Sequence, residues 1–446
     1  MTLAFVDPAS NIRDEIASRS GMPELPEKIW FHKTAAAVID ANRCVGCGGC
    51  IAACPSRSIG VAEDGRPTLV KMCTGCSACW DYCPLAGLRV ERLAKLFTDE
   101  QDKAFDISDV NLIPGDGRGA NRSFDSKSQV EEPSANTWTG NSANLGRIRA
   151  AYSAKAIRKA GGAQDGGVVT GLISELLKSG VIDGAIVSRK GDAFHSSTFL
   201  ATTVEEVLGS AGSVYHQSHP LSIFNHPLPN GIRRLAFVGT PCQISVLRAL
   251  QRYPWRYRST ATGAVVLTIA LFCTRSFDPD RLEAAVSNSG VETQSVSRLD
   301  IREGLLIAQN GEGVELLRKP VKEFVGAALF GCDECSDFAG LSADISVGNV
   351  GSELGKSTLL VRTETGEKAI FSALSGLHLE PLVDLGPISR IAAQDRKRAE
   401  RTSARGIDPD GNLWISYTEH LDYYSGTERT PKAPPAYRSY HFNVSC

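Results

Sequence analysis

The sequence predicts a chain of two folded parts: a small α+β module rich in cysteine, then a long linker, then a larger mixed α/β domain. Eight cysteines between residues 44 and 83 form two copies of one spacing, which predicts a compact metal-binding unit. Beyond about residue 146, apolar strand patterns alternate with helical patterns, as is typical of an α/β sheet domain. Between the two parts, a composition dominated by Asp, Ser, Asn, Gly and Glu cannot bury a core.

These changes in composition divide the chain into five segments. We expect an amino-terminal extension at 1–40, the cysteine module at 41–90, the linker at 91–145, the α/β domain at 146–395 and a carboxyl-terminal tail at 396–446. The cysteine module has little hydrophobic periodicity, so bound metal is expected to supply its cohesion. The tail is charged and poor in aliphatic residues, and we expect it to wrap around this protein or a partner.

The overall composition excludes several classes of function. A net charge of -2 gives no general reason to expect a nucleic acid or an anionic membrane as partner. The best apolar run, 263–272, has the length of a strand and is too short to span a bilayer. The amino terminus lacks the pattern of an export signal, so we expect a cytoplasmic location. Thirteen cysteines in such a chain predict metal ligands rather than disulfides, with Cys446 left over.

The strings CVGCGGCIAACP and CTGCSACWDYCP each match C-x-x-C-x-x-C-x-x-x-C-P, the run of bacterial ferredoxins that bind two 4Fe-4S clusters. In that run the fourth cysteine crosses to the other cluster. This predicts a first cysteine group of Cys44, Cys47, Cys50 and Cys83, and a second cysteine group of Cys54, Cys73, Cys76 and Cys79. A pair of zinc knuckles or a disulfide knot would not explain two full copies with the terminal proline.

A third cysteine group, Cys242, Cys273, Cys332 and Cys335, is spread along the α/β domain. A strand is expected to end at Gly239, where Thr240 and Gln243 have the pattern of a helix cap, and Cys242 would then lie in the first helical turn. Cys273 follows the strand pattern 263–272, and ligands gather at the carboxyl ends of strands in open α/β sheets. The spacing fits a third 4Fe-4S cluster, a structural zinc ion or buried thiols, and the neighbouring cysteine module favours iron and sulfur.

A chain of one-electron clusters beside an α/β domain suggests a flavin, because two-electron donors do not deliver directly into such clusters. GAQDGGVVTG has the form of a phosphate-binding turn, with Gly166, Gly167 and Thr170 offering donors at the start of a helix. The alternative is a tight turn into a helix and nothing more.

Three further segments carry weaker signals. His216 and His219 lie among Ser, Pro and Asn, which predicts a solvated loop. The basic stretch 147–159 could bind an anionic coenzyme tail, although a solvated helix face is the commoner explanation for such a stretch. The segment 359–371 has the pattern of a hairpin that turns near Thr365 and Gly366.

Several strings together resemble the beta-subunit family of coenzyme F420-reducing hydrogenases and dehydrogenases. They are QDGGVVTGLISELL, VIDGAIV, FVGTPCQISVLRAL, LFCTRSF and GCDECSDFAGLSADISVGNVG followed by STLLVRTETG, and they span about residues 145–375. The resemblance implies a flavin adenine dinucleotide (FAD) domain with its own 4Fe-4S cluster on the third cysteine group. It also implies that the flavin lies at Gly166, Gly167, Val168 and Thr170, with Gly239, Thr240 and Gln243 close by.

The resemblance implies an oxidoreductase that moves electrons between a soluble hydride carrier, the deazaflavin coenzyme F420, and a redox partner subunit or ferredoxin within a hetero-oligomeric complex. Relatives also include ferredoxin-dependent reductases of chlorophyll-type pigments, and a purely electron-transferring subunit is a further alternative. The sequence departs from the family pattern at Lys356, where an aromatic residue is usual, and in its long linker and tail.

Overall fold

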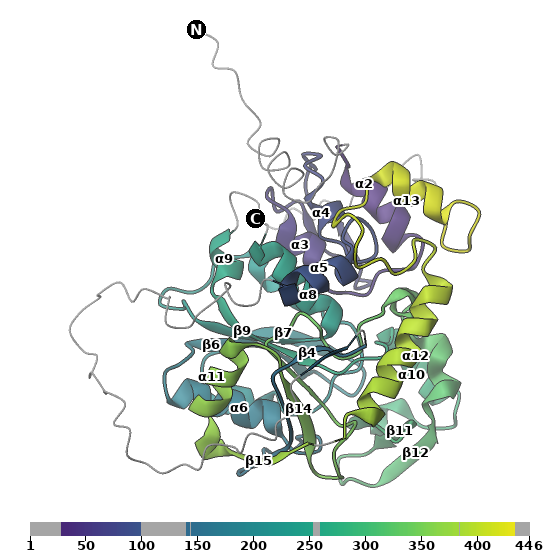
Figure 1. The fold of residues 1–446 in the computed structure, drawn as a ribbon. Helices are drawn as coiled ribbons and strands as arrows, with labels where there is room; N and C mark the ends of the chain where they lie inside the picture. Colours follow the sequence, from purple (N-terminus) through teal and green to yellow (C-terminus); the bar gives the residue numbers. More distant parts are fainter. Residues whose placement is uncertain (1–27, 100–139, 143, 253–258, 383, 433–446) are drawn as a thin grey trace, which may run out of the picture.

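The computed structural model describes residues 28–99, 140–142, 144–252, 259–382 and 384–432. The larger domain is built on one eight-stranded sheet (Figure 1). In spatial order the strands are β15 (Leu377–Pro381), β5 (Ala150–Ala156), β14 (Ser357–Val361), β13 (Ile345–Gly348), β9 (Val265–Leu271), β8 (Leu235–Gly239), β6 (Gly184–Lys190) and β7 (Ser196–Ala201). The four strands β13, β9, β8 and β6 pair in parallel, and the flanking strands pair antiparallel.

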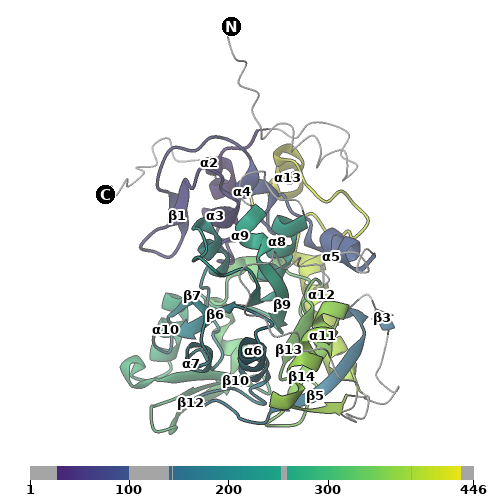
Figure 2. The same ribbon diagram turned by 90° about the vertical axis from the view of Figure 1, so that its left-hand side faces the viewer.

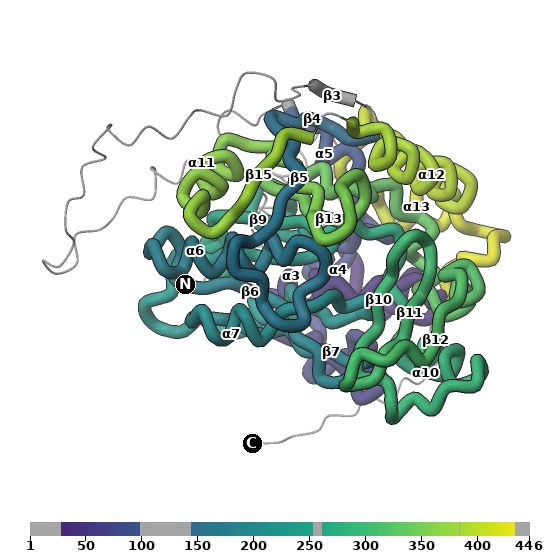
Figure 3. Tube along the Cα trace, turned by 90° about the horizontal axis from the view of Figure 1, so that it is seen from below, coloured from purple at the N-terminus to yellow at the C-terminus, as the bar shows by residue number. Residues whose placement is uncertain are grey.

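Helices cover both faces of this sheet. Helix α8 (Pro241–Arg252) lies on one face, and α6 (Val168–Lys178) and α11 (Glu364–Ser372) lie on the other, which faces the viewer in Figure 3. The alternation of side chains along β6 follows from strand geometry: Ile186 is buried on the side of α8, and Val187 is buried on the side of α6. The parallel strands are therefore apolar on both faces.

A second, smaller sheet stands beside the first. Its antiparallel strands are β10 (Arg298–Arg302), β11 (Leu305–Gln309) and β12 (Glu315–Pro320). Helix α10 (Pro279–Ser287) contributes Leu282 and Val286 to the core that this sheet shares with the 3-10 segment η5 (Val321–Ala327).

The cysteine module is made of short elements. In chain order they are α2 (Phe31–Thr34), η1 (Ala35–Ile39), α3 (Gly49–Ala53), β1 (Ile59–Val61), β2 (Pro67–Leu69), α4 (Ala78–Asp81) and α5 (Val90–Asp99). Gly48 and Ser77 occupy equivalent places in the two cysteine runs, and both adopt left-handed backbone conformations at the start of α3 and α4. The side chains of Trp80 and Tyr82 are completely buried. The module therefore has an apolar core in addition to whatever its cysteines bind.

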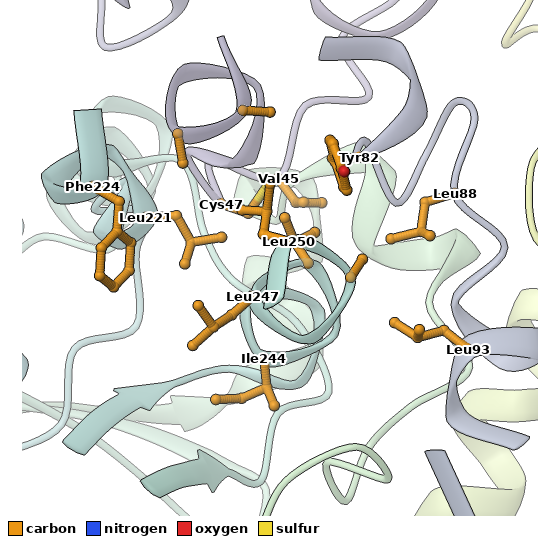
Figure 4. Packing of buried hydrophobic residues seen from close by; sticks show 14 of the residues in the cluster. Val45, Cys47, Tyr82, Leu88, Leu93, Leu221, Phe224, Ile244, Leu247 and Leu250 are labelled. Atoms are coloured by element: carbon orange, nitrogen blue, oxygen red, sulfur yellow. The ribbon is translucent and has the colours of Figure 1, made fainter. Parts of the chain in front are cut away.

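The cysteine module and the α/β domain share one hydrophobic core. Figure 4 shows side chains of the module facing the 3-10 segment η3 (Pro220–Asn225) and helix α8, and Figure 2 shows the module above α8. The labelled residues are Val45, Cys47, Tyr82, Leu88 and Leu93 from the module, and Leu221, Phe224, Ile244, Leu247 and Leu250 from the domain. The two parts are therefore packed directly against each other.

The start of the predicted linker is helical, because α5 extends to Asp99. Its apolar residues Leu93 and Phe97 are buried, and the ring of Phe97 lies 4.8 Å from the guanidinium of Arg248 on α8. This packing explains the helix in a segment whose composition predicted a linker. Residues 100–139 of the linker lie outside the described residues.

The described part of the carboxyl-terminal tail returns to the cysteine module. Helix α12 (Gly386–Thr402) leads to helix α13 (Tyr417–Tyr424), which lies beside α2 in Figure 1. Trp80 Nε1 donates to the Ile415 carbonyl at 2.8 Å, and Arg405 donates to the Pro84 carbonyl at 2.8 Å. The tail therefore packs on this protein.

Three local predictions were wrong. The segment expected to turn as a hairpin at Thr365 is helix α11, because the Thr363 hydroxyl accepts the Gly366 N–H at 3.1 Å and caps it. The basic stretch, read as a possible helix face, is strand β5 and its flanks, paired between β14 and β15. The rings of His216 and His219 are buried and not solvated.

No helix in the described part of the chain is long and apolar enough to cross a membrane.

Candidate iron-sulfur and flavin site

Twelve cysteines of the described residues are free thiols. Their electrostatic interactions show which cysteines of the module lie near one another. Cys50 interacts with Cys44, Cys47 and Cys83. Cys79 interacts with Cys54, Cys73 and Cys76. The fourth cysteine of each run therefore lies with the first three of the other run.

The third cysteine group gathers at the carboxyl edge of the large sheet. Cys242 lies in the first turn of α8, directly after β8, and Cys273 follows the end of β9. Cys332 and Cys335 come from η6 (Phe330–Glu334) and the residue after it. Cys332 interacts electrostatically with Cys242, and Cys273 interacts with both.

The three cysteine groups lie in a row. Cys50 of the first group interacts with Cys79 of the second, and Cys47 of the first group interacts with Cys242 of the third. The first group is therefore the middle one, between the outer part of the module and the sheet edge.

The cysteine sites disfavour free thiolates. Burial, followed by smaller influences of neighbouring groups, raises the pKa of Cys76 and of Cys83 to about 11 and that of Cys332 to about 12. Thiolates in such surroundings require a bound cationic centre, and iron supplies one in 4Fe-4S clusters.

Backbone donors point to the same kind of occupant. The Gly49 N–H lies 3.4 Å from Cys47 Sγ, the Ser58 N–H 3.2 Å from Cys54 Sγ, and the Ser276 N–H 3.4 Å from Cys332 Sγ. N–H groups directed at sulfur stabilise the charge of a cluster and tune its reduction potential. The residues present therefore fit iron-sulfur clusters.

The first set of flavin candidates lies where β5 leads into α6. Gly167 caps α6 with φ +64, and Gly166 passes so close to β5 that a Cβ would overlap the Ala154 carbonyl oxygen. Val168 is buried as the first residue of the helix. The Thr170 hydroxyl donates to the Gly167 carbonyl at 3.0 Å. The backbone conformation of Gly167 and the close approach of Gly166 to β5 therefore explain these glycines without reference to a ligand.

The second set lies where β8 leads into α8. Gln243 Oε1 accepts the Thr240 backbone N–H at 2.8 Å, and the Thr240 hydroxyl lies 3.2 Å from Cys242 Sγ. Gly239 leaves room for the Gln243 side chain, which a Cβ would meet at 2.7 Å. Thr240 therefore contacts the third cysteine group directly.

The two sets lie along the same edge of the sheet. Strands β5 and β8 run in the same direction, and β14, β13 and β9 lie between them. Four strand spacings correspond to about 19 Å. A ligand that touches both sets must be long.

Sequence reasoning missed two charged constellations. One is the buried ion pair of Arg43 with Glu334, whose partners are 291 residues apart. The other is a group of basic side chains near the glycine-rich loop, centred on β10. The alternation Arg298, Asp300, Arg302 was a usable signal, because these residues share one face of a strand.

Comparisons with known proteins connect this arrangement to a family. The family of coenzyme F420 hydrogenase/dehydrogenase beta subunits is described by two profiles: the amino-terminal one matches residues 150–225, and the carboxyl-terminal one matches 232–384. The chain belongs to this beta-subunit family. It is an oxidoreductase, and the resemblance inferred from its sequence motifs is confirmed. A 4Fe-4S dicluster domain matches residues 36–84, so the beta-subunit domain carries an iron-sulfur module at its amino-terminal side.

Relatives of this family resemble the chain over different lengths. An uncharacterised protein of Methanocaldococcus jannaschii is 30% identical, and the match covers 84% of this chain and 97% of the length of that protein. The coenzyme F420 hydrogenase subunit beta of Methanothermobacter thermautotrophicus is 31% identical over 54% of this chain and 88% of its own. A coenzyme F420-dependent sulfite reductase of Methanocaldococcus jannaschii is 34% identical over 58% of this chain and 42% of its own.

A solved structure supports the fold. A chain of the F420-reducing [NiFe] hydrogenase complex from Methanosarcina barkeri superposes with a TM-score of 0.55 at 28% identity. The match covers 59% of this chain and 94% of that chain. The beta-subunit fold is thus present together with additional segments.

Proposed function

We propose that this beta-subunit family member moves electrons between reduced coenzyme F420, a soluble two-electron carrier, and one-electron partners, using FAD and three 4Fe-4S clusters. The observation that carries the proposal is the row of three cysteine groups, which runs from the carboxyl edge of the sheet to the outer part of the cysteine module. A row of this kind suits stepwise electron transfer.

The residues of the chain would hold these groups as follows. The first and second cysteine groups would ligate the two clusters of the module, and the third group would ligate the cluster at the sheet edge. Gly166, Gly167, Val168 and Thr170, with Gly239, Thr240 and Gln243, would border the flavin. Bound flavin supplies the conversion between two-electron and one-electron transfer. Thr240 would lie between the flavin and Cys242.

The position of the third group supports a cluster over zinc. Cys242 interacts electrostatically with Cys47 of the first cysteine group, so a cluster here would stand next to those of the module.

We propose that electrons leave or enter at the second cysteine group. Two exposed apolar side chains lie beside it: Met72 precedes Cys73 and is 84% exposed, and Trp30, which packs against Gly75, is 44% exposed. Such a surface suits a redox partner subunit or a ferredoxin. Because several relatives are named as hydrogenase or dehydrogenase subunits, we propose a hetero-oligomeric assembly, and the free thiols suit a cytoplasmic location.

One observation bears on the substrate and therefore on a second candidate, a ferredoxin-dependent reductase of an organic substrate. Lys356, where the family usually has an aromatic residue, pairs with Glu380 at 2.7 Å and precedes Ser357, whose hydroxyl accepts the Gly166 N–H. The neighbourhood of the first flavin set is therefore more polar than the family pattern implies, which affects the choice of substrate.

Anaerobic reduction of the purified full-length chain separates these functions. We expect about twelve irons and one flavin per chain, and bleaching of the flavin by reduced coenzyme F420 but not by NADH or NADPH. Bleaching by reduced ferredoxin alone would favour the reductase. A preparation that binds clusters but no flavin would reduce the function to electron transfer within a larger complex.

A further inference from the structure

A cluster of charged side chains lies beside the glycine-rich loop 161–167, away from the cysteine groups. It consists of four basic and two acidic residues, called here the basic cluster: Lys159, Lys190, Arg298, Arg302, Asp165 and Asp300. The two arginines and Asp300 share one face of β10, Lys190 ends β6, and Asp165 belongs to the loop. Asp165 interacts electrostatically with Arg302, Asp300, Lys159 and Arg298.

Positive charge exceeds negative charge in the basic cluster. Arg298 and Arg302 bind the same oxygen of Asp300, with N–O distances of 3.1 and 2.9 Å. Asp165 is the second carboxylate, and burial raises its pKa. Four cations and two carboxylates leave a surplus of two positive charges.

Two donors of the basic cluster lack an acceptor. The Nε atoms of Arg298 and Arg302 are buried and have no hydrogen-bond partner among the described residues. The Lys190 side chain is half-buried, and burial, followed by the charge of Arg298, lowers the pKa of its ammonium. A buried donor without an acceptor is costly, so the two Nε atoms in one place indicate that an acceptor binds there.

The surroundings hold these donors in place against the loop. The Tyr215 hydroxyl accepts the Ile301 N–H of β10 at 3.0 Å and the Gln164 amide of the loop at 2.9 Å. A Cβ on Gly212 would lie 3.3 Å from Lys190 Nζ and 3.2 Å from the Gly162 carbonyl oxygen. The ammonium therefore lies directly beside the backbone of the loop that leads into α6.

We propose that the basic cluster binds a phosphoryl anion at the start of α6. Guanidinium and ammonium groups recognise phosphate oxygens, and the amino-terminal end of an eleven-residue helix adds a favourable dipole. Two sources can supply this anion: the diphosphate of the flavin dinucleotide, or a phosphoryl group on the soluble carrier. The choice between these sources rests on the function proposed above.

Variants of the full-length chain, purified with its flavin and clusters, test the site. Lys190→Gln and Arg302→Gln each remove one cation, and Arg302→Lys retains the charge. Arg318→Gln is the matched control, because Arg318 lies exposed on β12 of the same small sheet and pairs with Glu315. Two quantities are measured: flavin retained per chain after gel filtration, and the Kd of inorganic pyrophosphate by titration calorimetry.

The anion belongs to the flavin if both glutamine variants lose flavin and excess FAD restores it. In that case Arg302→Lys, which keeps the charge, should retain most of its flavin. The anion belongs to the soluble carrier if both variants retain their flavin and the Kd of inorganic pyrophosphate rises about tenfold or more. Unchanged flavin and unchanged pyrophosphate binding in both variants would overturn the proposal. Neither readout requires electron transfer, so failure of coenzyme F420 to reduce the flavin leaves this test intact.

Discussion

Arg43 and Glu334 form a two-point ion pair in the interior of the molecule. Arg43 Nε lies 2.7 Å from Glu334 Oε1, and Arg43 Nη2 lies 2.7 Å from Glu334 Oε2. Arg43 precedes Cys44 of the first cysteine group, and Glu334 is the last residue of η6, between Cys332 and Cys335. The Tyr424 hydroxyl of α13 donates to Glu334 at 2.5 Å. One carboxylate thus joins the cysteine module, the sheet domain and the tail.

Glu334→Gln tests this junction. Removal of the carboxylate charge leaves the completely buried guanidinium of Arg43 without its counter-ion, and we expect the free energy of unfolding to fall by about 3–5 kcal/mol. Chemical denaturation followed by circular dichroism measures it. Glu315→Gln breaks an exposed pair with Arg318 and is expected to change the free energy of unfolding little. Equal losses in the two variants would contradict a structural role for the buried pair.

His420 makes the docking of the tail sensitive to acid. Its Nε2 accepts from Arg43 Nη1 at 3.2 Å, so the ring is neutral with its proton on Nδ1. Burial, then repulsion by Arg43 and Arg405, lowers the pKa of His420 from 6.5 to about 2, while Glu334 and the Tyr424 hydroxyl face the same arginine.

Below pH 6.5 the His420 ring binds a proton in the unfolded chain but stays neutral in the folded chain. The contribution of the neutral ring to stability is therefore complete above pH 6.5 and falls as the pH decreases. We expect a slope of at most about 1.4 kcal/mol per pH unit below 6.5. Limited proteolysis of the tail between pH 7 and pH 5 measures its release. In His420→Gln the added sensitivity at pH 5 is expected to disappear, and a wild-type pH profile in this variant would refute the assignment.

Gly331 permits the close approach of η6 to the cysteine module. A Cβ at this position would overlap the Arg43 carbonyl oxygen, which is part of the backbone, and would also meet the Leu85 Cδ1 methyl at 2.5 Å. Gly331→Ala is expected to separate the module from the domain locally and to lower the apparent melting temperature by several degrees. Gly326→Ala, five residues earlier and facing open space, is the matched control and should change it little.

The third cysteine group is tested by iron content. Cys335→Ser removes one thiolate from this set of four, and we expect the iron per chain to fall by about a third, from about twelve to about eight. Cys446→Ser provides the control, since Cys446 lies outside the described residues and outside the three groups. Unchanged iron in Cys335→Ser, measured by colorimetric assay on protein of wild-type stability, would rule out this ligand set.

The local motifs of the sequence predicted more than its long-range contacts. The cysteine runs and the strand endings at Gly239 and Cys273 are encoded within about twelve residues each, so spacing and capping patterns were sufficient to propose the groups. The pairing of Arg43 with Glu334 depends on packing between distant segments, which no local pattern contains. His219 shows the same limit: its Nε2 lies 2.6 Å from the Gly65 carbonyl oxygen, so a residue in a polar stretch is buried by the module.

The core shared by the cysteine module and α8 also determines how electrons cross the protein. Because the module packs on the same helix that carries Cys242, it has no freedom to swing between a loading and an unloading position. If the chain works as proposed, transfer inside it would proceed by tunnelling over fixed gaps, and its rate is expected to be independent of solvent viscosity. Any slowing in glycerol would belong to the diffusional encounters with the carrier and the partner at the two ends.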